Sequence, residues 1–244
     1  SGSGRSAWPA VGSEVRSHVI KLGHVQVVPL WREWDEIAAI PADSPLNCVD
    51  EHSQKEMMKL IDEAKHDGDT LGGIVEVVAK GLPVGLGSHT AWNEKLDGRI
   101  AQALMSVHAI KAVEIGTGVA NAGKRGSEVH DEIFHEGGTF KRQTNRAGGL
   151  EGGITNGEEL RVRGYMKPIS TLRKALSSVD IDSKEPSDAA FERSDITAVP
   201  AAGVICEAML AVVLANAMRE KFGGDSIVEM RRNFDGYAAS VAEY

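Results

Sequence analysis

The chain has 244 residues, of which 42% are hydrophobic and 25% charged, so it is long enough for one large globular domain with a sizeable core. Its formal net charge of −8 argues against broad nucleic-acid binding, which needs a cationic face. Cys48 and Cys206 are the only cysteines, so we expect no disulfide framework, and a reducing cytoplasm is favoured.

Alternating apolar and polar residues predict strands in the first half of the chain, and apolar residues three or four apart predict helices. In chain order the expected elements are strands over 14–28 broken at Gly23, a short helix over 31–40, a helix over 53–65, a strand over 72–79, a helix over 96–110 and a strand over 112–115. Residues 1–13 begin with a Ser-Gly run and are expected to be a linker or tag, which leaves 14–244 as the domain.

The second half of the chain continues the mixture of strands and helices. Its expected elements are a polar excursion or hairpin over 121–143, a strand over 159–166, a helical segment over 171–176, a long apolar helix over 196–218 and a final helix over 226–242. Pro200 suits the first turn of the long helix, and Gly223 suits its C-terminus. The whole order predicts an α+β fold in which antiparallel sheets pack on central helices.

The apolar run from Ile196 to Met218 is long enough to span a bilayer. Alanine dominates it, and Pro200, Glu207 and Asn216 interrupt it. We therefore expect a core helix that is nearly wholly buried, and no association with a membrane.

The densest glycine stretch is residues 144–157, where Gly148, Gly149, Gly152 and Gly153 lie within six positions. Glycines this dense allow positive φ and let a ligand approach main-chain N–H groups that a Cβ would block. Neighbouring asparagine, threonine and arginine side chains could supply hydrogen bonds and a positive charge. A flexible hairpin or linker would have the same composition, so the pattern alone leaves both interpretations open.

Two later segments carry more specific chemistry. At the end of the predicted strand 159–166, Lys167 provides a cation, and Ser170 and Thr171 provide hydroxyls, a combination that suits a phosphate or the edge of a flavin ring. The plain alternative is a strand end with a solvated lysine. Further on, Arg193 could reach an anion and Asp195 could transfer a proton.

The alternative interpretation of the second segment is a helix cap. Ser194 or Asp195 would then simply satisfy the first N–H groups of the long helix that follows. Composition does not separate these two interpretations.

Two motif-like segments fail on spacing. Residues 118–124 fit a phosphate-binding P-loop until Arg125 replaces the required Ser or Thr. His130 and His135 are five residues apart, so on a helix they cannot share a metal face. We expect no metal site.

Taken together and in order, six segments resemble the chorismate synthase family. They are Asp67-Gly-Asp-Thr-Leu-Gly-Gly-Ile-Val-Glu, Gly81-Leu-Pro-Val-Gly-Leu-Gly, Ala109-Ile-Lys-Ala-Val-Glu-Ile-Gly, Thr144-Asn-Arg-Ala-Gly-Gly-Leu-Glu-Gly-Gly, Met166-Lys-Pro-Ile-Ser-Thr and Arg193-Ser-Asp. The resemblance runs from about residue 14 to about residue 242.

The resemblance implies a β-α-β sandwich and a lyase of the shikimate pathway of aromatic amino acid biosynthesis. Such enzymes eliminate phosphate from 5-enolpyruvylshikimate 3-phosphate in an anti-1,4 sense to give chorismate, with reduced FMN as cofactor. The resemblance also implies a cytoplasmic homotetramer, in which NADPH is a candidate reductant of the flavin.

The resemblance also implies residue roles. Asp195 would be catalytic, lying near the reactive edge of the flavin and helping to manage the proton on its N5 atom. The cofactor-binding residues would be His108, Ala109, Gly152, Lys167, Pro168, Ile169, Ser170, Thr171 and Arg193. His108 departs from the family, which usually has Gln at this position.

Three motifs from the family's N-terminal half do not occur in this sequence: Gly-Glu-Ser-His-Gly, Arg-Pro-Gly-His and Ser-Ala-Arg-Glu. They supply two catalytic histidines and several substrate-binding arginines. We therefore expect 14–244 to be the C-terminal portion of the family's domain and to be inactive alone. The alternatives are a non-catalytic flavin-binding or assembly module that keeps the fold, and an unrelated phosphate-binding protein.

Overall fold

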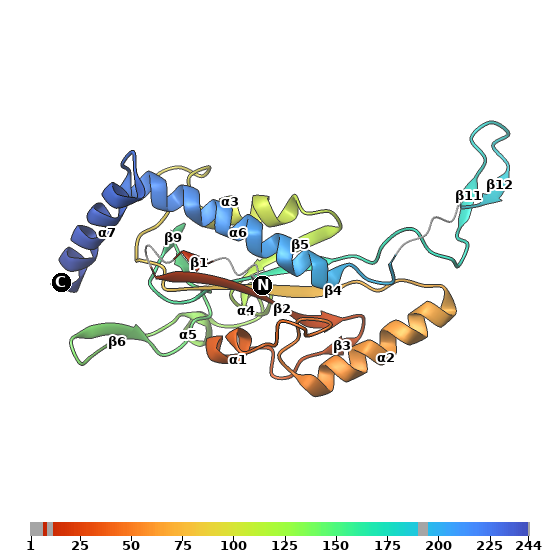
Figure 1. The fold of residues 1–244 in the computed structure, drawn as a ribbon, viewed down its shortest axis with the longest axis horizontal. Coiled ribbons are helices and arrows are strands. Elements are labelled where there is room, and N and C mark those ends of the chain that lie inside the picture. The colour runs from red at the N-terminus through yellow and green to blue at the C-terminus, as the bar shows by residue number, and fades with distance from the viewer. Residues whose placement is uncertain (1–6, 9–11, 190–194, 244) are drawn as a thin grey trace.

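An antiparallel sheet organises the part of the chain that the computed structural model describes, residues 7–8, 12–189 and 195–243 (Figure 1). The strand order is β1-β2-β4-β10-β5, and β3 pairs with β2 as the second arm of a hairpin that turns at Gly23. The strands span Ala7–Trp8 (β1), Ser13–Leu22 (β2), Val25–Gln26 (β3), Gly73–Lys80 (β4), Ile110–Ile115 (β5) and Leu160–Met166 (β10).

Two helices, α3 (Leu96–Met105) and α6 (Val199–Phe222), cover one face of this sheet (Figure 1). Successive side chains of a strand point to opposite faces, so the fully buried Val75 and Val77 of β4 and Val162 of β10 meet the helices. Sheet and helices together form one hydrophobic core. The expected α+β class with an antiparallel sheet on helices is confirmed.

The opposite face of the sheet is covered only in part. The short helix α1 (Trp34–Ala38) packs Trp34 and Ile37 against Val78 of β4. The longer α2 (Glu51–Asp67) lies beside β3. It begins at Asp50, whose side chain accepts from the Ser53 N–H at 2.6 Å, and ends at Gly68 in the left-handed conformation.

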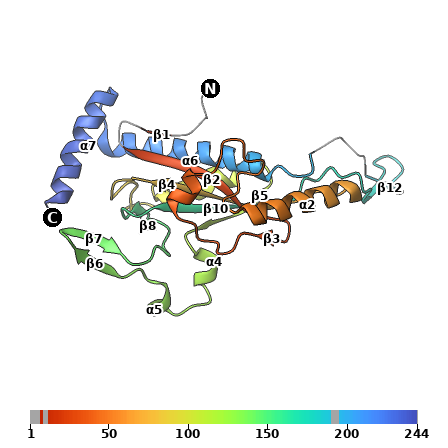
Figure 2. The ribbon, with the colours of Figure 1, turned by 60° about the horizontal axis from the view of Figure 1, so that its bottom comes forward.

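Two hairpins project from the body in opposite directions along its long axis, as both Figure 1 and Figure 2 show. One consists of β6 (Ile133–Glu136) and β7 (Thr139–Arg142), which confirms the hairpin expected within 121–143. The other consists of β11 (Ser177–Val179) and β12 (Pro186–Asp188).

The remaining elements are α4 (Gly118–Asn121), α5 (Gly126–Val129), the small hairpin β8 (Leu150–Glu151) and β9 (Ile154–Thr155), and the terminal helix α7 (Ile227–Ala242).

Helix α6 is apolar all round but only one side of it is buried. Leu210 and Cys206 are fully buried against the sheet side, whereas Val204, Ile205 and Val212 are at least half exposed. The expectation of a nearly wholly buried helix is therefore wrong, because its second side has no covering layer among the described residues. By length and composition this helix is also a candidate membrane span, but in this fold it packs on the sheet.

Two of the expected helical segments differ from the structure. Residues 171–176 are not helical; the Lys174 N–H instead donates to the Gly68 carbonyl at 3.0 Å, which ties this segment to the end of α2. The helix expected over 96–110 ends at Met105, and the chain then turns through Ala109 at φ 65° before β5 begins. The other expected elements are confirmed to within a few residues.

Burial predicts opposite outcomes for two α6 substitutions. Leu210→Ala should lower the free energy of unfolding by about 2–5 kcal/mol, because it removes a fully buried side chain. Val212→Ala, at an exposed position of the same helix, should change it by less than about 0.5 kcal/mol. Urea unfolding measures both, and equal effects would contradict the packing described.

Candidate functional site

The first candidate site lies where β10 ends. The Lys167 N–H donates to the Ala109 carbonyl at 2.9 Å, so the turn before β5 and the segment after β10 lie side by side. The Lys167 side chain is exposed and forms no ion pair with any residue that the structure describes. His108 is also exposed.

The segment after Lys167 is held against the loop that precedes β4. The Thr70 hydroxyl donates to the Ile169 carbonyl at 2.6 Å. Gly72 permits the close approach, because a Cβ at that position would lie 2.8 Å from the Pro168 nitrogen. The backbone of segment 167–171 is therefore held in place, while the side chains of Lys167 and Ser170 are exposed.

Asp195 lies at the same end of the sheet. The Leu71 N–H donates to the Ile196 carbonyl at 2.8 Å, which fixes the chain just after Asp195. A cleft of about 520 Å³ is lined there by Lys65, Asp69, Thr70, Thr171, Asp195, Thr197 and neighbouring residues. A second cleft of about 350 Å³ is lined by His108, Met166 and the first turns of α6. The segment that leads into α6 contributes to both clefts, since Asp195, Ile196 and Thr197 line the first and Ala198 lines the second.

The helix-cap interpretation of Asp195 is wrong. Helix α6 begins at Val199 with Ala198 as its N-cap, so Asp195 precedes the helix by several residues and its side chain is exposed. Arg193 and Ser194 lie outside the described residues. The structure thus groups Asp195 with Thr171, and Lys167 with Ala109, in one region.

The glycine-rich stretch forms a hairpin at the other end of β10. Strands β8 and β9 pair through Leu150–Thr155 and Glu151–Ile154, and Gly152 lies at the tip with φ 63° and open space where a Cβ would be. Gly148 serves packing instead, because a Cβ there would collide with the backbone of Gly116.

Asp131 anchors the start of this stretch. Its carboxylate accepts from the Thr144 hydroxyl at 2.5 Å and from the N–H groups of Arg146 and Ala147 at 2.8 and 2.9 Å. Burial alone would raise the pKa of Asp131, but these hydrogen bonds and the nearby Arg146 charge outweigh it and hold the pKa below its usual range. These three hydrogen bonds therefore fix the start of the glycine-rich stretch against Asp131.

Gly152 and Lys167 do not meet within one chain. Strand β10 runs between them, and its seven residues separate the two ends by about 20 Å. Figure 1 accordingly shows β9 toward the α7 end of the molecule, whereas α2 lies toward the other end. The resemblance assigns both segments to the flavin, but one chain does not bring them together, and the cofactor role of Gly152 stays a prediction.

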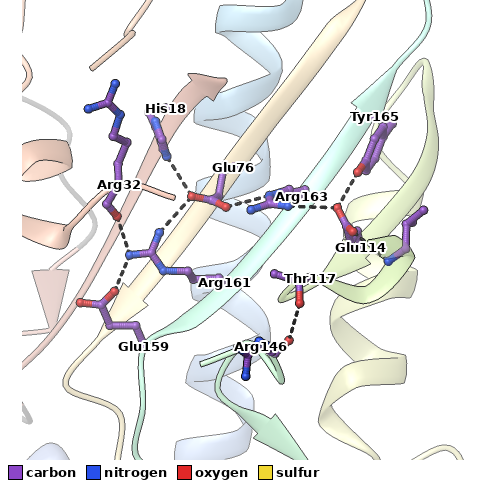
Figure 3. A network of polar contacts seen from close by, with 11 residues as sticks. His18, Arg32, Glu76, Glu114, Thr117, Arg146, Glu159, Arg161, Arg163 and Tyr165 are labelled. Carbon is purple, nitrogen blue, oxygen red and sulfur yellow. Dashed lines mark hydrogen bonds and ion pairs between the residues drawn. The ribbon is translucent and has the colours of Figure 1, made fainter. Parts of the chain in front are cut away.

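A buried charge network, which sequence reasoning missed, crosses the sheet on the face opposite α6 (Figure 3). The Glu76 carboxylate of β4 accepts from Arg161 at 3.1 Å and from Arg163 at 2.8 Å, and contacts His18 at 3.0 Å. Arg163 also reaches Glu114 of β5 at 3.3 Å. The side chains of His18 and Glu76 are completely buried.

Residues at the edges of this network also contact the surrounding loops. Arg161 donates to Glu159 at 2.6 Å and to the Arg32 carbonyl at 2.7 Å, and its guanidinium lies 3.8 Å from the Trp31 ring centroid. At the far edge the Tyr165 hydroxyl donates to Glu114 at 2.5 Å. Alternating arginines in a predicted strand were the available signal, since charges two residues apart on a buried strand need partners.

The network shifts the pKa of three of its members, Glu76, Tyr165 and Arg163, and the charges of Glu76 and Glu114 raise that of Arg163 despite its burial. Burial would raise the pKa of Glu76, but His18, Arg163 and Arg161 outweigh it and hold the pKa below its ordinary value. Burial and the hydrogen bond to Glu114 raise the pKa of Tyr165 to about 12. Glu76 is therefore a buried carboxylate held ionised by its partners.

Comparison with known proteins agrees with the architecture. A protein-family model described as chorismate synthase matches residues 5–219. The chorismate synthase of Solibacter usitatus is 53% identical over 96% of this chain and 61% of its own length, and that of Salinispora tropica is 57% identical over 93% and 58%. A solved structure titled "Crystal Structure of Chorismate Synthase" superposes with a TM-score of 0.78 at 40% identity, covering 96% of this chain and 65% of that one.

The fold and the matches together define an α+β protein of one enzyme family. The chain is a member of the chorismate synthase family. It spans about three-fifths of the length of the curated relatives it matches.

The charge network predicts a pH-dependent loss of stability. Because the folded-state pKa of Glu76 lies below its unfolded value of about 4.3, its contribution is fully present above that pH and is lost as the pH falls through the folded-state pKa. Glu76→Gln should lower the free energy of unfolding by about 3–5 kcal/mol at pH 7, because it removes the carboxylate that two buried guanidinium groups share and leaves each with one remaining carboxylate, Glu159 or Glu114.

The same measurement has an internal control. The difference between wild type and Glu76→Gln should shrink below about pH 4.3, and Glu51→Gln, at an exposed position in α2, should change little at either pH. Urea unfolding at pH 7 and pH 3 provides the test; a Glu76→Gln difference that persists undiminished at pH 3 would contradict the ionised state of Glu76.

Proposed function

We propose that this chain carries part of the reduced-FMN site of an enzyme that eliminates phosphate from 5-enolpyruvylshikimate 3-phosphate to give chorismate. The observation that supports this most is the grouping of Lys167–Thr171, His108–Ala109 and Asp195 at one end of the sheet. In a member of this family, that grouping unites almost all of the residues that the resemblance assigns to the flavin.

The residues present suit an anionic flavin. Lys167 is exposed without an ion pair among the described residues, so its charge is available to a phosphate or an electron-rich ring. Ser170 and Thr171 follow on a backbone that Thr70 and Gly72 hold in place. The two clefts, to which residues 195–198 contribute, leave room for a ring and its side chain.

Each group then has a chemical task. When bound, reduced FMN supplies electron density to the allylic system from which phosphate departs. Lys167, with Arg193, would neutralise negative charge, and the hydroxyls of Ser170 and Thr171 would orient the ligand. Asp195 would hold or accept the proton at the flavin N5 position, and NADPH is the proposed source of reducing equivalents.

We further propose that the protein acts as a homotetramer. Gly152 can share a flavin with Lys167 only if another copy supplies one of the two, because they lie at opposite ends of β10 in one chain. The exposed, open position of Gly152 at a hairpin tip suits such a contact.

The alternative is a flavin-binding or assembly module without catalysis, which the chain's span of about three-fifths of its relatives keeps in consideration. Anaerobic assay of the chain with reduced FMN and 5-enolpyruvylshikimate 3-phosphate separates the two. Chorismate formation, followed by ultraviolet absorbance, supports the enzyme, whereas flavin binding without chorismate supports the module.

Lys167→Ala tests the flavin site directly. Removing an exposed cation that contacts the ligand should weaken FMN binding roughly tenfold or more. Lys111→Ala, an exposed lysine in β5, is the matched control and should leave the Kd unchanged. Flavin fluorescence titration measures both, and an unchanged Kd in Lys167→Ala would remove this residue from the site.

Asp195→Asn tests the proton-handling role. In a preparation that forms chorismate in the assay above, turnover should fall by roughly 10²- to 10⁴-fold while the Kd for FMN stays within about twofold, because the amide keeps the shape of the side chain but cannot accept a proton. A parallel loss of flavin affinity would instead assign Asp195 to binding.

A further inference from the structure

Segment 68–72 contacts both parts of the proposed flavin site. It joins the end of α2 to the start of β4. The two parts of the site are segments 167–174 and 195–198, which the β11–β12 hairpin separates in the sequence. Every residue of 173–186 is exposed, so this hairpin does not hold the two parts against the body of the molecule. Their relative position therefore depends on contacts with other segments.

Toward the first part of the site, segment 68–72 makes two hydrogen bonds. The Thr70 hydroxyl donates to the Ile169 carbonyl at 2.6 Å. The Lys174 N–H donates to the Gly68 carbonyl at 3.0 Å. One bond holds segment 167–174 near its start, and the other holds its end.

The next residue of segment 68–72 holds the second part of the site. The Leu71 N–H donates to the carbonyl of Ile196, the residue after Asp195, at 2.8 Å. Thr70 and Asp195 also line the same cleft of about 520 Å³. Two adjacent residues, Thr70 and Leu71, thus contact the two parts of the site, and the separation of those parts depends on both.

Segment 68–72 is itself anchored at both of its ends. The Asp69 N–H donates to the Ala64 carbonyl in the last turn of α2 at 2.8 Å. The Gly23 N–H, in the turn of the β2–β3 hairpin, donates to the Gly72 carbonyl at 2.8 Å. The segment is therefore a fixed support, attached to a helix and to the sheet, against which the two parts of the site are held.

Thr70 supplies the one of these contacts that a side chain makes. The other bonds named above join backbone atoms, so they survive a change of side chain. Thr70 is 7% exposed, so water has little access to replace its hydroxyl. Pro168 lacks an N–H and donates no backbone hydrogen bond, which increases the importance of the contact at Ile169.

We propose that Thr70 is a positioning residue of the flavin site. Its hydroxyl holds the Ile169 carbonyl, so that Lys167, Ser170 and Thr171 stay in a constant position relative to Asp195. It acts through the segment that it holds and is assigned no contact with the flavin. The effect on flavin binding rests on the proposed function, whereas the holding of segment 167–174 by Thr70 does not.

Hydrogen–deuterium exchange without any ligand tests how Thr70 holds the segment. Thr70→Val keeps the shape of the side chain but removes the hydroxyl, so exchange in peptides that cover 167–174 should speed up by roughly three- to tenfold. Thr70→Ser keeps a hydroxyl and should restore the wild-type rates.

Ser13→Ala is the matched control for that experiment. Ser13 is also buried, and its hydroxyl donates to a distant backbone carbonyl, that of Gly81, at 2.9 Å. Its loss should leave exchange in 167–174 unchanged. Unchanged exchange in Thr70→Val, or equal acceleration of 167–174 in Ser13→Ala, would overturn the holding role.

Flavin titration of the same variants tests the positioning role. Thr70→Val should raise the Kd for FMN by roughly three- to tenfold, because the loss of one hydrogen bond leaves the ligand to order the segment. Thr70→Ser should stay within about twofold of wild type, and Ser13→Ala should leave the Kd unchanged. Rescue by serine separates a role of the hydroxyl from a general loss of stability.

The possible failures are distinguishable. Faster exchange in Thr70→Val with an unchanged Kd for FMN would overturn the positioning role of Thr70 and leave the proposed flavin site intact. Absence of FMN binding by the wild-type chain would instead overturn the proposed site and with it the effect of Thr70 on flavin. In that case the exchange rates still decide whether Thr70 holds segment 167–174.

Discussion

One buried carboxylate connects four strands of the main sheet: β2, β4, β10 and β5. Glu76 lies in the central strand β4, and it binds His18 of β2 on one side and both arginines of β10 on the other. Through Arg163 and Glu114 the same network reaches β5. Bringing these charges out of water is costly, so the arrangement holds only while each charge keeps its partners, and a shift of one strand would leave several unpaired.

This constraint explains why β10 can act as a rigid spacer. One face of the strand is packed on α3 and α6 through apolar residues, and the other face is fixed by Arg161 and Arg163. The strand therefore holds the glycine hairpin and Lys167 at a constant separation. A single site that uses both ends therefore needs a second copy of the chain, because the fixed strand does not let one chain bring its two ends together.

Much of the fold follows from the sequence, because strand alternation and helical spacing are local properties. Strands β4 and β10 and the caps of α6 are examples in which local chemistry agrees with the final packing. The half-exposed state of α6 could not be predicted, since a helix that is apolar all round carries no signal of which side is covered. The loop at 171–176 was missed because its backbone partners are at the end of α2, far away in sequence.

The candidate site was also predictable from the sequence only in part. The chemistry of Lys167, Thr171 and Asp195 is visible in their residue types, and the structure brings their segments to one region. The resemblance assigns both Gly152 and Lys167 to one flavin, but the strand between them separates its ends by about 20 Å, so one chain does not bring them together. From the sequence, the Glu76 network was visible only as unexplained charges in apolar strands, because its members come from four separate strands.

The central claim is that one end of the sheet, at segments 108–110, 167–172 and 195–198, binds FMN. Hydrogen–deuterium exchange of the chain with and without saturating FMN tests this most directly. The account predicts that added flavin slows exchange in these three segments together, with little change in the terminal helix α7. Protection confined to other parts of the sheet, or no protection in these segments at a flavin concentration that saturates binding, would contradict it.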